Sequence, residues 1–144
     1  MVKKTFSVLI CFIGLIIFVS TLNGQGSKKT IILSNGEVVW DLNGEWDALY
    51  EGFGSLQWVG KLKDMVKITQ QGGSFVGIKM IGTAFVPKDA VSVEGELDKN
   101  GIKKVRVQPS TNTAEALDGK GQISDDGNKI IIDAEILRVT LTRK

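Results

Sequence analysis

From Thr30 onward the chain is a series of short runs in which apolar and polar residues alternate, with glycine-containing turns between the runs. Successive side chains on a β-strand point to opposite faces, so a period of two predicts strands with one buried face and one exposed face. No apolar stripe with helical spacing extends beyond a turn or two. The pattern therefore predicts an all-β protein.

The runs divide into eight consecutive strands, expected at residues 44–51, 64–71, 73–82, 91–98, 102–108, 119–124, 128–133 and 136–142. Short turns connect most of them, so we expect neighbours in sequence to pair antiparallel. Such a series most naturally closes into an up-and-down barrel because closure removes both exposed edges, and a sandwich of two sheets is the alternative. Ahead of it, residues 30–33 and 37–40 flank an Asn35-Gly36 turn and predict an additional hairpin.

Loop lengths predict the register of three hairpins, because the correct length brings apolar side chains onto the same face of both strands. A three-residue loop at 71–73 has Gly73 in the left-handed conformation that such loops require. The apolar pairs expected for the three hairpins are Ile68 with Val76, Val66 with Ile78, Val93 with Val107 across a loop at 99–101, and Ile123 with Ile130 across a type I′ turn at Asp126-Gly127.

The alternation and the registers assign a set of bulky side chains to the inside of the barrel. The set is Trp46, Tyr50, Val66, Ile68, Val76, Ile78, Val93, Val105, Val107, Ile130, Ile132, Val139 and Leu141. An eight-stranded barrel is just wide enough to be filled by such side chains or to hold one small ligand. The bulk of the set favours a filled barrel, and we expect any remaining room beside Gly95 and Gly121, which lie on the same phases.

Two residues at opposite ends of the series predict how the barrel closes. Trp46 begins the first strand in Gly44-Glu-Trp46, and Arg143 follows the apolar phase of the last strand. Because the first and last strands of a closed barrel are neighbours, we expect the Arg143 guanidinium to lie over the Trp46 ring, a cation-π contact worth about 1 kcal/mol.

Gly44, Trp46 and Arg143 together resemble the closure motif of the calycins, the lipocalin-like superfamily of ligand-binding barrels. The resemblance implies an eight-stranded up-and-down barrel and the binding of a small ligand. The helix that follows the barrel in lipocalins has no counterpart in this sequence.

The first 24 residues have the composition of a secretory signal peptide. Lys3 and Lys4 precede an unbroken apolar run at 8–19, which is shorter than the roughly 20 residues of a membrane-spanning helix. We therefore expect cleavage near Gly24 or Gly26, in preference to an uncleaved anchor, and an exported protein that is periplasmic or extracellular. The predicted organisation is a signal peptide at 1–24, an extension or hairpin at 25–43 and a barrel domain at 44–144.

Charge and composition of the mature chain exclude several classes of function. Removal of Lys3 and Lys4 lowers the 18 basic residues to 16, which equals the 16 acidic residues. A neutral chain lacks the excess positive charge that nucleic acids require. Cys11, the only cysteine, lies in the signal peptide, and the chain has no histidine. Thiol catalysis, Ser-His-Asp chemistry and ordinary zinc sites are thus excluded, and we expect neither an enzyme nor a cofactor or metal.

Two acidic groups have structural explanations. Glu94 and Glu96 share one strand face, as a carboxylate pair for acid-base chemistry would, but the register places Glu94 opposite Arg106 and Glu96 opposite Lys104. Charge pairing on a solvated face therefore explains them. The turn at 125–128 offers oxygens to calcium, but the twelfth position of an EF-hand loop would be an isoleucine, and the hairpin already explains the turn.

The connection at 53–60 is the best candidate for a binding site because it joins the first two barrel strands and carries two aromatic residues. In a lipocalin-like barrel this connection covers the open end, so the resemblance implies that Phe53 and Trp58, with the inward-facing Tyr50, contact a ligand. The alternative is that the two aromatic residues simply plug the barrel end. The second long connection, 110–119, is expected to be a polar loop or a single helical turn around 114–117.

The sequence thus predicts an exported, monomeric, non-enzymatic barrel that binds a small apolar or amphipathic ligand. The alternative is a protein-interaction or inhibitor module with a solidly packed barrel, which an exposed apolar patch including Trp40 or Trp58 would favour. An enzyme that uses carboxylates alone would need two acidic side chains converging in a pocket. The sequence identifies no such pair.

Overall fold

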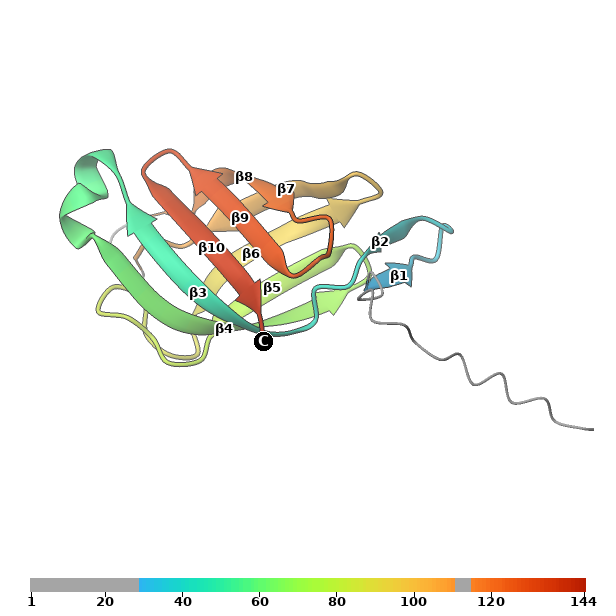
Figure 1. Ribbon diagram of the computed structural model, residues 1–144, viewed down its shortest axis with the longest axis horizontal. Helices are drawn as coiled ribbons and strands as arrows, with labels where there is room; N and C mark the ends of the chain where they lie inside the picture. The colour runs from blue at the N-terminus through green and yellow to red at the C-terminus, as the bar shows by residue number, and fades with distance from the viewer. Residues whose placement is uncertain (1–28, 111–114) are drawn as a thin grey trace, which may run out of the picture.

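Eight antiparallel strands close into a barrel in the computed structural model, which describes residues 29–110 and 115–144. The strand order is β10-β3-β4-β5-β6-β7-β8-β9, and a hairpin of β1 and β2 forms a separate two-stranded sheet (Figure 1). The all-β barrel and the additional hairpin are confirmed, and the two-sheet sandwich is wrong. The expected signal peptide at 1–24 lies outside the described residues, as does part of the expected loop or helical turn in the second long connection.

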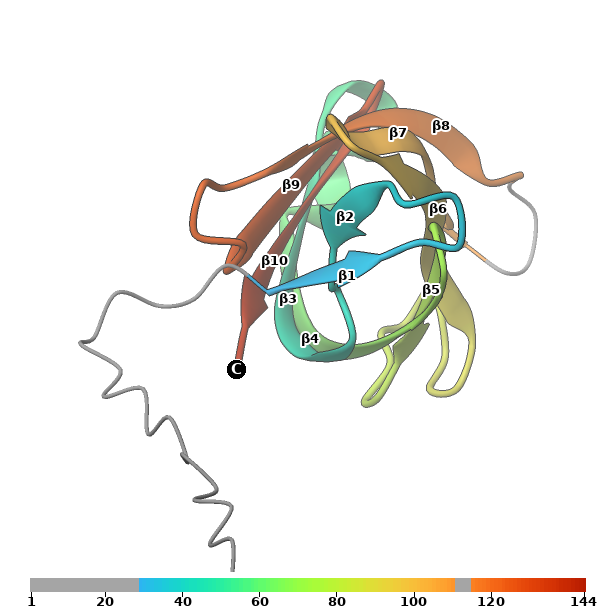
Figure 2. The ribbon, with the colours of Figure 1, turned by 90° about the vertical axis from the view of Figure 1, so that its right-hand side faces the viewer.

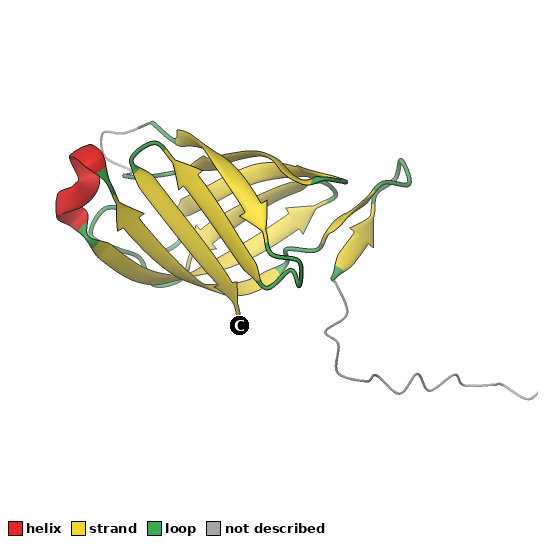
Figure 3. Ribbon diagram, turned by 45° about the horizontal axis from the view of Figure 1, so that its top comes forward, coloured by secondary structure: helices red, strands yellow, loops and turns green. Residues whose placement is uncertain are grey.

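The bounds of the elements are close to those expected. They are β1 (Thr30–Ile32), β2 (Val38–Trp40), β3 (Gly44–Gly52), the 3-10 helix η1 (Gly54–Val59), β4 (Lys61–Gln71), β5 (Ser74–Lys79), β6 (Val91–Asp98), β7 (Gly101–Val107), β8 (Leu117–Ile123), β9 (Lys129–Ala134) and β10 (Leu137–Arg143). Figure 3 shows η1 at one end of the strands and the hairpin at the other. Leu117, expected near a helical turn, instead begins β8.

Pairing of β3 with β10 closes the barrel and places Arg143 directly opposite Trp46. The guanidinium carbon of Arg143 lies 4.3 Å from the Trp46 ring centroid. The same guanidinium donates hydrogen bonds to the carbonyl oxygens of Asp41 (2.7 Å) and Asn43 (3.0 Å). Arg143 therefore fastens the segment before β3 to the last strand while covering the indole.

The segment that follows the hairpin covers this end of the barrel. Leu42 is fully buried, and its carbonyl oxygen accepts a hydrogen bond from the Trp46 indole N–H at 3.0 Å. The buried Gln70 side chain accepts the Leu42 backbone N–H at 2.7 Å and donates to the carbonyl oxygen of Trp40 at 2.9 Å. Figure 2, which looks at the barrel from this end, shows β1 and β2 lying in front of its opening.

The expected register of the β4–β5 hairpin is wrong by one residue. Ile68 pairs with Gly77, and the loop consists of two residues, since Gln71 pairs with Ser74. A slip of one residue turns every side chain to the opposite face. Val76 and Ile78 therefore lie on the outer surface, 36% and 38% exposed, and not among the inward set.

Packing inside the barrel explains why this register is adopted. A Cβ atom at Gly77 would come within 2.8 Å of both Val66 and Val93, so the inward phase of β5 needs a residue without a side chain there. The same phase buries Phe75 (2% exposed) and brings Lys79 within 3.0 Å of Asp64. Gly72, and not Gly73, has the left-handed φ, of +58°.

The other registers are confirmed, although two of the turns differ. Val93 pairs with Val107, Glu94 with Arg106, Glu96 with Lys104, and Ile123 with Ile130. The β6–β7 loop has two residues, because Asp98 pairs with Gly101 beyond a register shift after Glu96. The β8–β9 turn is not type I′. That turn needs a positive φ at both central residues, and Asp89 is the one described non-glycine residue with a positive φ.

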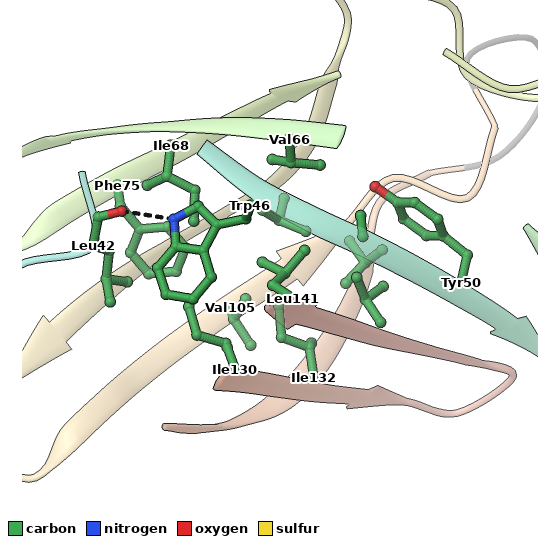
Figure 4. Close-up of a cluster of buried hydrophobic side chains, with 14 of the residues drawn as sticks. Leu42, Trp46, Tyr50, Val66, Ile68, Phe75, Val105, Ile130, Ile132 and Leu141 are labelled. Atoms are coloured by element: carbon green, nitrogen blue, oxygen red, sulfur yellow. Dashed lines mark hydrogen bonds between the residues drawn. The ribbon is translucent and has the colours of Figure 1, made fainter. Parts of the chain in front are cut away.

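Apart from Val76 and Ile78, every residue of the expected inward set is buried. Figure 4 shows the centre of this core, with Trp46 among side chains from several strands and Tyr50 further along the same face of β3. The space inside the barrel beside Gly95 and Gly121 is occupied. An added Cβ would lie 2.8 Å from the Phe75 ring at Gly95 and 2.6 Å from Ile102 at Gly121. Phe75 and Ile102 therefore fill the space that these glycines leave.

Replacement of Trp46 by alanine should lower the free energy of unfolding by about 3–5 kcal/mol because it empties the centre of the core.

Arg143→Met should lower the free energy of unfolding by about 2 kcal/mol, since the cation-π contact and the bonds to the carbonyl oxygens are lost together. Urea unfolding followed by circular dichroism measures both. Arg138→Met is the matched control on β10, where the side chain is exposed and pairs with Asp133. Equal losses for the two arginine variants would contradict the closure role of Arg143.

Candidate functional site

A cavity of about 360 Å³ opens at the end of the barrel that is opposite the hairpin. Its walls come from the end of β3, from η1, from the start of β4 and from the loops that follow β5 and β7. Most of the lining is apolar and includes Leu56, Leu62, Val86, Leu117, Ile136 and Leu137. The barrel is thus filled around Trp46 (Figure 4) and hollow at the η1 end.

Helix η1 covers the mouth of this cavity and is itself largely exposed. None of its residues is buried, and Trp58 is 73% exposed. The Trp58 and Phe85 rings form a T-shaped contact, with centroids 5.6 Å apart and planes at 77°. Phe85 lies in the connection between β5 and β6. Gly54 and Gly60, at the two ends of the helix, have left-handed φ values of +53° and +68°. The cover is therefore a short aromatic lid between two glycines.

Of the three residues expected to bind a ligand, Tyr50 and Trp58 line the cavity. Phe53 is not among its lining residues. The Phe53 side chain is 45% exposed, and its ring centroid lies 6.0 Å from the guanidinium carbon of Arg138. The structure thus brings two of the three together. Their role in ligand binding stays a prediction.

The cavity floor carries a buried ion pair that the sequence analysis did not identify. Lys79 Nζ lies 3.0 Å from Asp64 Oδ2, and the two side chains are 2% and 0% exposed. The ammonium also lies 3.8 Å from the ring centroid of Tyr50. The Tyr50 hydroxyl shares a 2.6 Å hydrogen bond with Ser92 Oγ. Four polar side chains from β3, β4, β5 and β6 thus form one network at the inner end of the cavity.

Backbone donors stabilise the charge on Asp64 in addition to Lys79. Its carboxylate accepts the N–H groups of Met65 at 2.6 Å, Ile81 at 3.2 Å and Gly82 at 3.1 Å. Burial alone would raise the pKa of Asp64, but the hydrogen bonds from Lys79 and from the backbone outweigh it and hold the pKa below its usual range. Asp64 is therefore ionised at neutral pH, with Lys79 as its counter-ion.

Burial acts on the two other titratable groups of the floor. It lowers the pKa of Lys79, although the neighbouring Asp64 opposes the shift. Burial also raises the pKa of Tyr50, so that its hydroxyl keeps its proton throughout the neutral range. The 3.0 Å contact of Lys79 with Asp64 and the hydrogen bond of Tyr50 with Ser92 thus give the floor an ion pair and a hydroxyl pair.

A signal for this network was present in the sequence. Asp64 shares the inward phase of Val66 and Ile68, where a charged residue requires a partner. Lys79 supplies that partner, but the one-residue register error assigned it to the outer face. The acidic and basic residues could be matched only after the β4–β5 register was known.

The other candidates from the sequence stay at the surface. Arg106 lies 3.7 Å from Glu94 and 3.5 Å from Asp118, and all three side chains are exposed. Asp126 accepts hydrogen bonds from Ser124 Oγ and the Asn128 N–H within its own turn. Across residues 29–110 and 115–144, no three acidic, histidine or cysteine side chains gather as metal ligands.

Among the described residues, no helix has the length and apolar composition needed to cross a membrane. Comparison with protein-family models, with curated proteins and with solved structures found no match to this chain. The geometry of the cavity is thus the basis on which a function can be inferred.

Loss of one partner of the buried ion pair should destabilise the protein strongly. Lys79→Met leaves the Asp64 carboxylate without its cation, which typically costs about 3–5 kcal/mol. The double variant Asp64→Asn/Lys79→Met should be more stable than Lys79→Met alone, because the amide oxygen of asparagine still accepts the backbone N–H groups. Lys61→Met, at the exposed pair of Lys61 with Glu51, is the control. Urea unfolding of the full cycle measures the coupling, and strictly additive losses would show that the pair does not interact.

The pH dependence of stability should report the same pair. Asp64 has a lowered pKa in the folded state, so the unfolded chain binds more protons below the ordinary aspartate pKa of about 4. The stabilisation is present above that pH and is lost as the pH falls through the folded pKa. We expect the free energy of unfolding to fall more steeply below about pH 4 in the native chain than in Asp64→Asn/Lys79→Met. Parallel curves would show that Asp64 does not carry the effect.

Proposed function

We propose that this protein is an exported, non-enzymatic barrel that binds a small apolar or amphipathic ligand beneath η1. The observation that carries the proposal is the cavity of about 360 Å³ with a mainly apolar lining. Ligand sites in proteins have volumes of roughly 300–1,000 Å³, and a few placed polar groups fix the ligand's orientation. The ion pair and hydroxyl pair at the floor are groups of that kind.

The arrangement of the two barrel ends supports this proposal. Trp46, Leu42 and Phe75 are buried at one end, so we expect a ligand to enter from the opposite end, where η1 lies. The ends of the lid are fixed by backbone hydrogen bonds from Phe53 to Ile136 and from Gly52 to Gly60, while Trp58 itself packs only its ring against Phe85 and stays largely exposed. A barrel wall with a short, solvent-exposed cover suits reversible capture of a small molecule.

Membership of the calycins is part of the proposal. The contact of Arg143 with Trp46 and the left-handed φ of Gly44, +130°, support it, because they place the three motif residues at the closed end of an eight-stranded barrel. Export rests on the signal-peptide pattern of residues 1–24. The carboxylate nearest the described lining residues, Asp64, is paired with Lys79, and no second acidic side chain joins it among those residues, which supports a binding function over acid-base catalysis.

A protein-interaction module is the second candidate function. The outer face of β5 and β6 carries Val76, Ile78 and Val91, which are between 36% and 40% exposed. Ile78 and Val91 pair directly, so the side chains form one apolar strip on the barrel wall. Apolar strips of this kind occur at protein-binding surfaces.

The proposal is tested first by native mass spectrometry of the protein purified from its own host. A reproducible additional mass that denaturation removes would establish a bound small molecule. A second copy or another protein in the spectrum, with no small-molecule mass, would favour the interaction module.

Trp58→Ala should weaken the binding of a neutral fluorescent probe, N-phenylnaphthylamine, by about tenfold with little loss of stability, because the side chain covers the cavity while being largely exposed. Leu117→Trp should abolish probe binding by filling the cavity. Ile81→Ala, which removes an exposed apolar side chain elsewhere, is the control. Fluorescence titration and thermal melting are measured together. A large stability loss in Trp58→Ala would favour the plug interpretation, and unchanged binding in Leu117→Trp would contradict the site.

A further inference from the structure

The charges at the cavity floor are already balanced. Lys79 and Asp64 pair at 3.0 Å and are almost fully buried, so the floor has one positive and one negative charge. A ligand carboxylate placed beside them would be removed from water without a counter-ion of its own, and a ligand ammonium would face the same cost. The floor therefore favours a ligand that is neutral at its inner end.

The floor has more free hydrogen-bond donors than free acceptors. Asp64 already accepts bonds from Lys79 and from the backbone N–H groups of Met65, Ile81 and Gly82. The Lys79 ammonium has three N–H donors, of which one bonds to Asp64 while the face of the Tyr50 ring lies beside the group. The acceptor is thus saturated, whereas the donor retains capacity.

The hydroxyl pair adds to this excess of donors. Tyr50 and Ser92 share one hydrogen bond, in which either hydroxyl is the donor. Two hydroxyl groups carry two hydrogens, so one O–H remains beyond the bond between them. When Ser92 donates, the remaining hydrogen belongs to Tyr50, which lines the cavity.

Polar groups nearer the mouth are engaged in local bonds. Thr83 Oγ1 accepts the Val86 N–H at 3.2 Å, and the Gln108 side-chain amide donates to the Ser110 carbonyl oxygen. These bonds hold the connections that form the wall. Selection of the ligand's polar group therefore takes place at the floor, from Lys79 and Tyr50.

We infer that the ligand of this cavity is a neutral apolar molecule with a hydrogen-bond acceptor, such as a carbonyl oxygen, at its inner end. The inference rests on the proposed function and specifies its ligand class. The acceptor takes a hydrogen bond from the Lys79 ammonium or the Tyr50 hydroxyl, while the chain lies against the apolar wall. A carboxylate or an amine with an apolar chain of the same length as this ligand binds more weakly, because the ion pair is already balanced.

The test is a competition series of ligands of equal chain length at neutral pH, in which decane, its methyl ketone, decanoate and decylamine displace N-phenylnaphthylamine. The ketone should bind most tightly, with decane at least about tenfold weaker, because decane cannot accept a hydrogen bond from Lys79 or Tyr50. Decanoate and decylamine should bind at least about tenfold more weakly than decane. Tighter binding of either charged ligand than of the ketone, or equal binding of decane and ketone, would overturn the inference alone. Failure of all four to bind would overturn the proposed function as well.

An independent measurement uses Asp64→Asn, which keeps an oxygen for the backbone N–H groups but removes the negative charge. Lys79 is then without a counter-ion, so decanoate should gain at least about tenfold in affinity while decane is unchanged. Glu51→Gln removes a carboxylate from the exposed Lys61 pair and is the control. An unchanged preference in a folded Asp64→Asn protein would contradict the role of the ion pair. The native series decides the inference even if this variant does not fold.

Discussion

The pairing of β3 with β10 is the contact on which the rest of the structure depends. It joins the first barrel strand to the last and thereby gives every barrel strand two neighbours, so no long edge is left open. Closure also defines an interior that the side chains must fill or leave empty. Arg143 and Trp46 stabilise this junction, and the bonds of Arg143 to Asp41 and Asn43 tie the preceding segment across the same end.

Filling of the interior is uneven along the barrel axis. Near Trp46, Phe75 occupies the space over Gly95, and Gly77 accommodates Val66 and Val93. Towards η1, strand side chains such as Leu62, Leu117 and Leu137 line the cavity without filling it. The two ends therefore have different roles. Packing at the Trp46 end stabilises the barrel, and the η1 end contains the cavity.

The network of Lys79, Asp64, Tyr50 and Ser92 lies where the packed half meets the cavity. A buried ion pair is rarely more stable than an apolar replacement of the same volume, so stability alone gives little reason for its presence. Its position at the cavity floor supports a role in selecting the ligand. The charges are neutral as a pair, and the donors that remain set the polarity of that surface.

The sequence by itself determined the strand content, the eight-strand series, the additional hairpin and the pairing of Glu94 with Arg106, because alternation and turn residues are local properties. It did not determine the β4–β5 register. An alternation of period two allows either Val76 and Ile78 or Phe75 and Lys79 to face the barrel interior. The choice between these two registers is made by contacts with other strands: Gly77 leaves room for Val66 and Val93, and Lys79 pairs with Asp64. The cavity was decided by the tertiary structure for the same reason. Its volume is the part of the barrel interior that side chains from distant strands leave unfilled. No local sequence pattern specifies that volume.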